Sequence, residues 1–203
     1  VIKRKFGLDG KRIILFVGRL AKRKGVKEFI QHSLGRIARA IPHVCFVVAG
    51  NNPTESLTQR DDTIREIEAA ISATGLLGYV RLLGGLSDED IIGLYQACDL
   101  FVLPALESES DVEGFGIVLL EAAAAGKPAV ATRVGGIPDA VEDRKTGHLT
   151  KPGDYEGLGD AIISLLNDGQ RKHVMGEAAM RRAQEDFCWA KIVVEYEAVF
   201  GAL

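Results

Sequence analysis

A basic segment near the amino terminus carries side chains suited to an anion. Gly18 is followed by Arg19, and Lys24 and Gly25 come five and six residues after that arginine. An arginine fork and a lysine point charge beside the amino end of a helix suit a diphosphate. The segment matches neither the Gly-x4-Gly-Lys-Ser/Thr loop nor the Gly-x-Gly-x-x-Gly motif. Taken alone, it indicates a basic surface loop equally well.

Two glutamates further along the chain could bind hydroxyl groups. Glu113 and Glu121 are separated by seven residues, and Gly114 and Gly116 follow the first of them. A carboxylate can accept two hydroxyl hydrogen bonds, so each glutamate suits a sugar diol or a ribose. Two glutamates at this spacing occur often by chance. Their position after an apolar segment, with glycines beside them, makes a binding role more credible. The segment Gly135-Gly136-Ile137-Pro138 is a third candidate, for either a close ligand or a simple turn.

Short apolar segments alternate with helical patterns and must position these residues. The strands we expect are Arg12–Val17, Val44–Ala49, Tyr79–Leu83, Leu100–Leu103, Pro128–Thr132 and Gly147–Leu149. The expected helices are Gly25–Ala40, Asp61–Thr74, a helix capped by Ser87, Gly116–Ala125 and the chain from Asp154 onward. Strands that are apolar on both sides and alternate with helices predict a parallel sheet covered on both faces. We therefore predict one Rossmann-like, doubly wound α/β domain over residues 1–203, with its ligand at the carboxyl ends of the strands.

Composition narrows the class of protein further. The 203 residues are 47% hydrophobic and 26% charged, which excludes a largely disordered chain. No apolar run is long enough for a membrane-spanning helix. The net charge of −3 argues against a dedicated nucleic-acid binder, although residues 1–50 carry +10 and the remainder −13. The three cysteines lack metal-ligand spacing, so we expect buried small residues rather than a metal site.

The order and spacing of several motifs resemble a known family. The chain is similar to the carboxyl-terminal half of a GT-B glycosyltransferase of the large retaining family 4, and the likeness extends over essentially all of it. The motifs that carry it are Phe16-Val17-Gly18-Arg19-Leu20 with Lys24-Gly25, Val80-Arg81-Leu82-Leu83-Gly84, Leu103-Pro104, Glu113-Gly114-Phe115-Gly116 through Glu121-Ala122, Gly126-Lys127-Pro128-Ala129-Val130-Ala131, Gly135-Gly136-Ile137-Pro138 and Thr146-Gly147-His148-Leu149.

The resemblance implies a role for each candidate residue. Arg19 and Lys24 would hold the diphosphate of a UDP-, GDP- or ADP-sugar and stabilise the charge on the leaving nucleotide. Glu113 would contact the transferred hexosyl group and Glu121 the ribose hydroxyls. The remaining contacts would come from Gly18, from the main chain near Arg81 and Leu82 for the base, and from the N–H groups of Phe115, Gly116, Ile117 and Val118. Transfer would retain the anomeric configuration and need no metal or other cofactor.

The same resemblance implies a partner domain. An acceptor sugar, lipid or small molecule would be bound by an amino-terminal domain that this chain lacks. The helices expected at 188–203 would pack on that domain or, left exposed, form a dimer. We expect a cytoplasmic protein, with peripheral attachment at the inner membrane face left open. Two segments depart from the family pattern: Gly50-Asn51-Asn52-Pro53, and a long loop from Pro104 to Glu113.

Two alternatives remain at the level of sequence. A nucleotide-sugar 2-epimerase would keep the fold and change the reaction, and incubation with UDP-GlcNAc without an acceptor would distinguish it. A non-catalytic binding module would have lost part of the site. The presence of all four residues Arg19, Lys24, Glu113 and Glu121 argues against a non-catalytic module. Mutations that accumulate without selection usually replace at least one residue of such a set.

Overall fold

The structure is a computed structural model that describes residues 1–51, 63–107 and 113–201. Asn52 and Pro53 of the first atypical segment lie outside the described residues. So do the start of the helix expected from Asp61 and residues 108–112 of the long loop.

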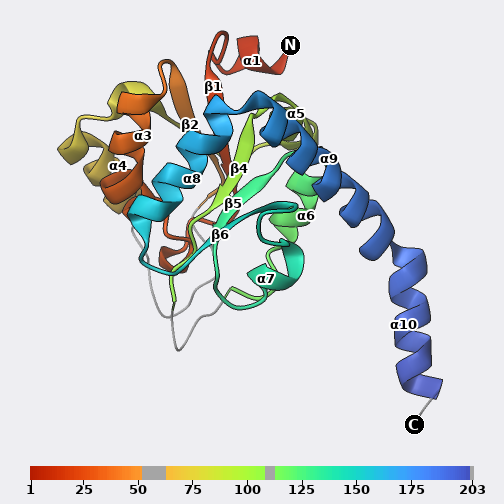
Figure 1. Cartoon of the computed structure of the whole chain (residues 1–203). Coiled ribbons are helices and arrows are strands. Elements are labelled where there is room, and N and C mark those ends of the chain that lie inside the picture. Colours follow the sequence, from red (N-terminus) through yellow and green to blue (C-terminus); the bar gives the residue numbers. More distant parts are fainter. Residues whose placement is uncertain (52–62, 108–112, 202–203) are drawn as a thin grey trace.

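Six strands form a single parallel sheet in the order β3-β2-β1-β4-β5-β6 (Figure 1). Their bounds are β1 (Arg12–Val17), β2 (Val44–Ala49), β3 (Val80–Gly84), β4 (Leu100–Leu103), β5 (Ala129–Thr132) and β6 (Gly147–Thr150). All neighbouring pairs run parallel. The predicted doubly wound, Rossmann-like sheet is confirmed.

Helices cover both faces of the sheet. The elements are α1 (Ile2–Lys5), η1 (Lys22–Lys24), α2 (Val26–Phe29), η2 (Ile30–Leu34), α3 (Gly35–Ala40), α4 (Thr63–Thr74), η3 (Leu77–Tyr79), α5 (Asp88–Ala97), α6 (Ile117–Ala124), α7 (Ile137–Ala140), α8 (Tyr155–Asn167), α9 (Gly169–Asp186) and α10 (Trp189–Gly201). Helices α3, α4 and α8 gather on one side, whereas α6 and α9 pack together on the other (Figure 1). Burial from both sides explains why the inner strands β1, β2, β4 and β5 are almost entirely buried, whereas the edge strands β3 and β6 contain the partly exposed Arg81 and His148.

The core lies between the sheet and these two helical layers. Phe16, Phe46 and Phe101 from three adjacent strands are fully buried, and Phe29 of α2 meets Phe46 edge-to-face at 4.8 Å. Cys45 and Cys98 are buried free thiols, as the sequence predicts. Such close-packed apolar contacts supply most of the favourable free energy of folding.

A partly buried carboxylate connects three elements at the amino ends of the strands. Asp99, just before β4, accepts a 2.8 Å hydrogen bond from the N–H of Ile13 in β1. Its other oxygen accepts a 2.6 Å bond from the ammonium of Lys172 in α9. Burial raises the pKa of Asp99, but these bonds outweigh it and hold that pKa below its usual value.

Helix boundaries follow the capping chemistry of the sequence, with one interruption. The Ser87 hydroxyl accepts a 3.3 Å bond from the N–H of Asp90 and caps α5, as predicted. Pro138 lies in the first turn of α7. The helix expected over Gly25–Ala40 is divided instead into α2, a π-helical turn η2 and α3. The wider turn adds a residue to the helix while Ile30, Leu34 and Ile37 all remain buried.

The last helix extends away from the body of the domain (Figure 1). The exposed fractions of Trp189, Tyr196 and Phe200 are 80%, 63% and 68%. The apolar face expected on this helix is therefore uncovered in this chain. No helix within the described residues is both long enough and apolar enough to span a membrane.

Candidate functional site

The candidate site lies where the loops after β1 and β4 meet. Chain connections leave these neighbouring strands toward opposite edges of the sheet, and such a switch point opens a crevice at the carboxyl ends. The N–H of Leu106 donates a 2.7 Å bond to the carbonyl oxygen of Arg23, which joins the two loops. Gly25 has φ +69°, and a Cβ there would lie 1.9 Å from the carbonyl oxygen of Pro104. Only glycine permits this close approach.

A compact cluster of charges occupies the junction. One carboxylate oxygen of Glu113, Oε2, accepts a 2.7 Å hydrogen bond from the ammonium of Lys24. The same oxygen is bonded by the guanidinium of Arg23. The side chains of Glu113, Lys24 and Arg23 are only 7%, 8% and 11% exposed. The structure therefore brings together Lys24 and Glu113, which are 89 residues apart in sequence.

Among the described residues of this cluster, cationic side chains outnumber carboxylates. Burial lowers the pKa of Lys24; the bond to Glu113 and its charge act in the opposite direction, and the charges of Arg23 and Arg19 lower the pKa further. Arg19 follows β1 directly and is exposed at the carboxyl edge. Arg23 and Lys24 contact Glu113, and Arg19 is close enough for its charge to act on Lys24. Such a local concentration of cationic side chains attracts an anion.

The start of α6 presents backbone donors beside this cluster. Gly116 has φ +77° at the amino end of the helix, and no side chain caps that end. Among the described residues, none accepts a hydrogen bond from the N–H of Ile117 or Val118. These unpaired N–H groups and the helix dipole favour a negatively charged group. Phe115 instead packs against Phe187, with ring centroids 5.5 Å apart.

The glycine pair after β5 fixes the loop that holds Glu113. The N–H of Gly136 donates a 2.6 Å bond to the carbonyl oxygen of Gly114. A Cβ on Gly136 would lie 2.3 Å from that oxygen. This close backbone contact explains the second glycine of Gly135-Gly136, which the sequence left open between a turn and a ligand contact.

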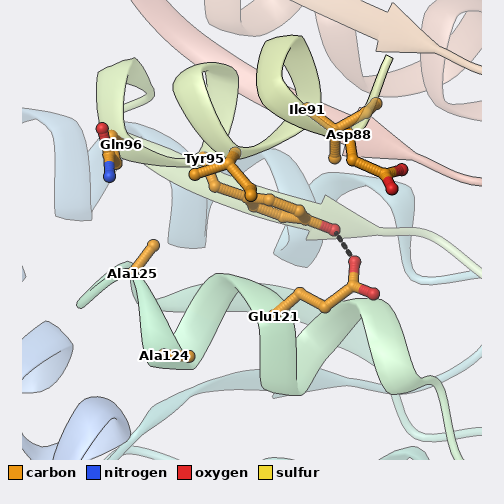
Figure 2. A pocket seen from close by; sticks show the side chains of 8 residues that line it. Asp88, Ile91, Tyr95, Gln96, Glu121, Ala124 and Ala125 are labelled. Atoms are coloured by element: carbon orange, nitrogen blue, oxygen red, sulfur yellow. Dashed lines mark hydrogen bonds between the residues drawn. The ribbon is translucent and has the colours of Figure 1, made fainter. Parts of the chain in front are cut away.

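Glu121 lies one turn further along α6, in a groove between α5 and α6 (Figure 2). The groove has a volume of about 600 Å³, and Asp88, Ile91 and Gln96 of α5 contribute to its wall. Glu121 is exposed, and its Oε2 accepts a 2.7 Å hydrogen bond from the hydroxyl of Tyr95. Tyr95 was not predicted from the sequence as a residue of the site.

The other predicted contacts lie on or beside β1 and β3. Arg81 and Leu82 are inside β3, which continues to Gly84, and the Arg81 guanidinium donates to the carbonyl of Val80 at 3.0 Å. Leu82 faces a hollow of about 440 Å³ shared with α4. At Gly18 the nearest atom to an added Cβ would be in the Phe16 ring, 3.8 Å away. The carboxyl end of β1 is thus open at this glycine.

Two residues of the site escape prediction from the sequence. Arg23 belongs to the basic segment that ends at Lys24, and this segment is evident in the sequence. Its ion pair with Glu113 is not evident there, because that contact depends on the fold. Tyr95 has no sequence signal because it meets Glu121 from another helix. Within the described part of the chain, no three histidine, cysteine or acidic side chains are grouped to hold a metal ion.

Fold and site together define a doubly wound domain with an anion-binding switch point. The sequence identifies the family: residues 1–182 match the family described as glycosyl transferases group 1. The chain belongs to this family, and the resemblance seen in the sequence is confirmed.

Individual relatives agree with this assignment. The chain is 32% identical over 197 residues to D-inositol 3-phosphate glycosyltransferase of Corynebacterium aurimucosum, covering 94% of this chain and 43% of that protein. It is 30% identical over 190 residues to a GDP-mannose-dependent phosphatidylinositol monomannoside mannosyltransferase of Mycolicibacterium smegmatis, covering 93% and 47%. The chain thus spans less than half the length of these relatives.

A protein of known structure has the same fold. Anabaena HepE in complex with UDP superposes with a TM-score of 0.84 at 27% identity, covering 100% of this chain and 52% of that one. Its complex with UDP-glucose gives a TM-score of 0.82.

Proposed function

We propose that this chain is the donor-binding domain of a retaining hexosyltransferase that uses a nucleotide-diphosphate sugar. The observation that carries the proposal is the charge cluster at the switch point, where Arg23 and Lys24 contact Glu113 and Arg19 lies close to Lys24, beside the open amino end of α6. Cationic side chains next to the amino end of a helix suit a diphosphate. The UDP and UDP-glucose bound to the Anabaena protein support this choice of ligand class.

Each side chain has a role in the proposed reaction. Arg19 and Lys24 bind the diphosphate and stabilise the negative charge that grows on it as the glycosidic bond to the sugar breaks. The N–H groups of Ile117 and Val118 add donors on the same side. Glu113 accepts hydrogen bonds from the transferred sugar, and Glu121 accepts them from the ribose. Because protein cations supply the charge stabilisation, the proposed mechanism requires no metal.

The proposal includes a second domain outside this chain. The relatives are about twice as long as this chain, so we assign acceptor binding to a second domain. The exposed face of α10 would pack on that domain. The isomerase alternative receives no support from the relatives described above, which are transferases by name.

Calorimetry with the 203-residue chain tests donor binding. We expect one of UDP-glucose, GDP-mannose and ADP-glucose to bind, and Arg19→Ala to weaken it about tenfold or more, as loss of a charge-assisted hydrogen bond predicts. Arg39→Ala is the matched control, because Arg39 is an exposed arginine on α3 away from the cluster. Absence of binding to all three, or equal binding by the Arg19 and Arg39 variants, contradicts the proposal.

A further inference from the structure

The Tyr95 hydroxyl holds one oxygen of Glu121 and is itself fixed by its surroundings. Tyr95 is 4% exposed, and its ring lies 5.8 Å from that of Phe101 in β4. The hydroxyl is 2.7 Å from Glu121 Oε2 and 3.4 Å from the carbonyl oxygen of Val118. Both acceptors belong to α6, so a side chain rooted in α5 defines where the glutamate carboxylate lies (Figure 2).

Glu121 needs such a partner because nothing else in the described structure restrains it. Its side chain is exposed, and the bond from Tyr95 is its only hydrogen bond to a described residue. A free glutamate loses considerable rotamer entropy when it is ordered. The bond from Tyr95 orders the carboxylate before any ligand arrives and occupies Oε2, leaving Oε1 to accept further hydrogen bonds.

The chemistry of the pair suits a permanent donor. Burial, followed by the bond to Glu121 and the charge of Glu121, raises the pKa of Tyr95 far above its ordinary value. The phenol is therefore protonated at neutral pH, and it donates its hydrogen to Glu121. An ionised carboxylate only accepts hydrogen bonds, and one donor leaves several of its lone pairs available. A carboxylate held in place by that donor can therefore accept hydrogen bonds from both hydroxyls of a vicinal diol, and its fixed position sets the orientation of the diol.

We propose that Tyr95 is a positioning residue, whose hydroxyl orients Glu121 to accept hydrogen bonds from the 2′- and 3′-hydroxyls of the donor ribose. This inference rests on the proposed function, which places the ribose at Glu121. It adds a residue that acts through Glu121 without touching the ligand. Preorganisation of this kind raises affinity by reducing the ordering cost of binding.

The test compares two ligands in two proteins. The ligands are UDP, or whichever of UDP, GDP and ADP binds best, and its 2′,3′-dideoxy analogue. We expect the unsubstituted chain to bind the ribonucleotide about tenfold or more tightly than the analogue, the size of a charge-assisted hydrogen bond. Tyr95→Phe keeps the ring and removes the hydroxyl. It should reduce this ratio severalfold and leave the affinity for the analogue unchanged.

Two controls separate positioning from general damage. Tyr79→Phe removes a hydroxyl from a half-buried tyrosine outside the groove and should leave the ratio unchanged. Tyr95→Phe placed in a Glu121→Ala background should have no further effect on the ratio, because its effect passes through that carboxylate. This second comparison remains informative even if Tyr95→Phe lowers stability.

The outcomes distinguish the two proposals. If the unsubstituted chain binds neither ligand, the proposed function fails. If it binds both ligands equally, nucleotide binding stands, but the ribose role of Glu121 is wrong and the inference about Tyr95 fails with it. If that chain discriminates and Tyr95→Phe discriminates equally well, only the role of Tyr95 is overturned. An equal loss of affinity for both ligands in Tyr95→Phe also overturns it, since that pattern indicates structural damage.

Discussion

The shared carboxylate of Glu113 leads to a prediction about stability. Glu113→Gln leaves the buried cations Arg23 and Lys24 without their common partner, and breaking a buried ion pair in this way costs about 3–5 kcal/mol. Lys24→Met leaves Glu113 bonded to Arg23. It removes a charge-assisted bond worth about 1.5–3 kcal/mol, but it also removes the burial cost that lowers the pKa of Lys24.

The two substitutions should therefore differ clearly. We expect Lys24→Met to remain within about 1.5 kcal/mol of the unsubstituted chain, because its two effects oppose each other. The gap of at least about 1.5 kcal/mol corresponds to a difference of at least about 3–6 °C in Tm for a domain of this size. Urea unfolding at pH 7, followed by circular dichroism, measures the difference in the free energy of unfolding.

An exposed ion pair provides the matched control. Lys145 donates to Glu142 at the surface, where both side chains are well exposed. Glu142→Gln and Lys145→Met should each change the free energy of unfolding by less than about 1 kcal/mol. Equal destabilisation by Lys24→Met and Glu113→Gln would refute the reasoning, because Arg23 would then not support the carboxylate alone.

Two further predictions concern the fold. The lowered pKa of Asp99 means that its contribution to stability is complete above the unfolded-state pKa of about 3.9 and is lost as the pH falls through the lower, folded-state pKa. Asp99→Asn should therefore flatten the dependence of unfolding free energy on pH below about 4, measured by urea titration between pH 2.5 and 6; an unchanged slope would count against the pairing with Lys172. Gly25→Ala should cost more than about 3 kcal/mol, because both φ and a backbone oxygen exclude the methyl group. Gly7→Ala, with φ +65° but no atom within 4 Å, should cost only about 1 kcal/mol, and equal losses in thermal unfolding would show that the close contact is unimportant.

The inner strands β1, β2, β4 and β5 were predictable because burial on both faces makes them largely apolar segments. All six strands agree with the structure to within a residue at either end. The π-helical turn at Ile30–Leu34 was not predictable, since an added residue still leaves the apolar positions compatible with an ordinary helix.

The site was predictable where its residues lie in the loops that follow the strands. Arg19 and Lys24 after β1, and Glu113 after β4, could be placed at one edge from the topology of the sheet alone. The bonds from Arg23 to Glu113 and from Tyr95 to Glu121 could not, because they depend on how side chains from separate loops and helices pack. The roles assigned to these residues in donor binding remain predictions.

Peptide groups, rather than side chains, connect the loops around the candidate site. The bonds from Leu106 N–H to the Arg23 carbonyl and from Gly136 N–H to the Gly114 carbonyl survive any change of side chain at the two acceptor residues. Substitution at the neighbouring exposed positions can alter what the site contacts without moving the loops that form it. Related sequences can consequently keep the same backbone arrangement in these loops while different side chains contact different ligands.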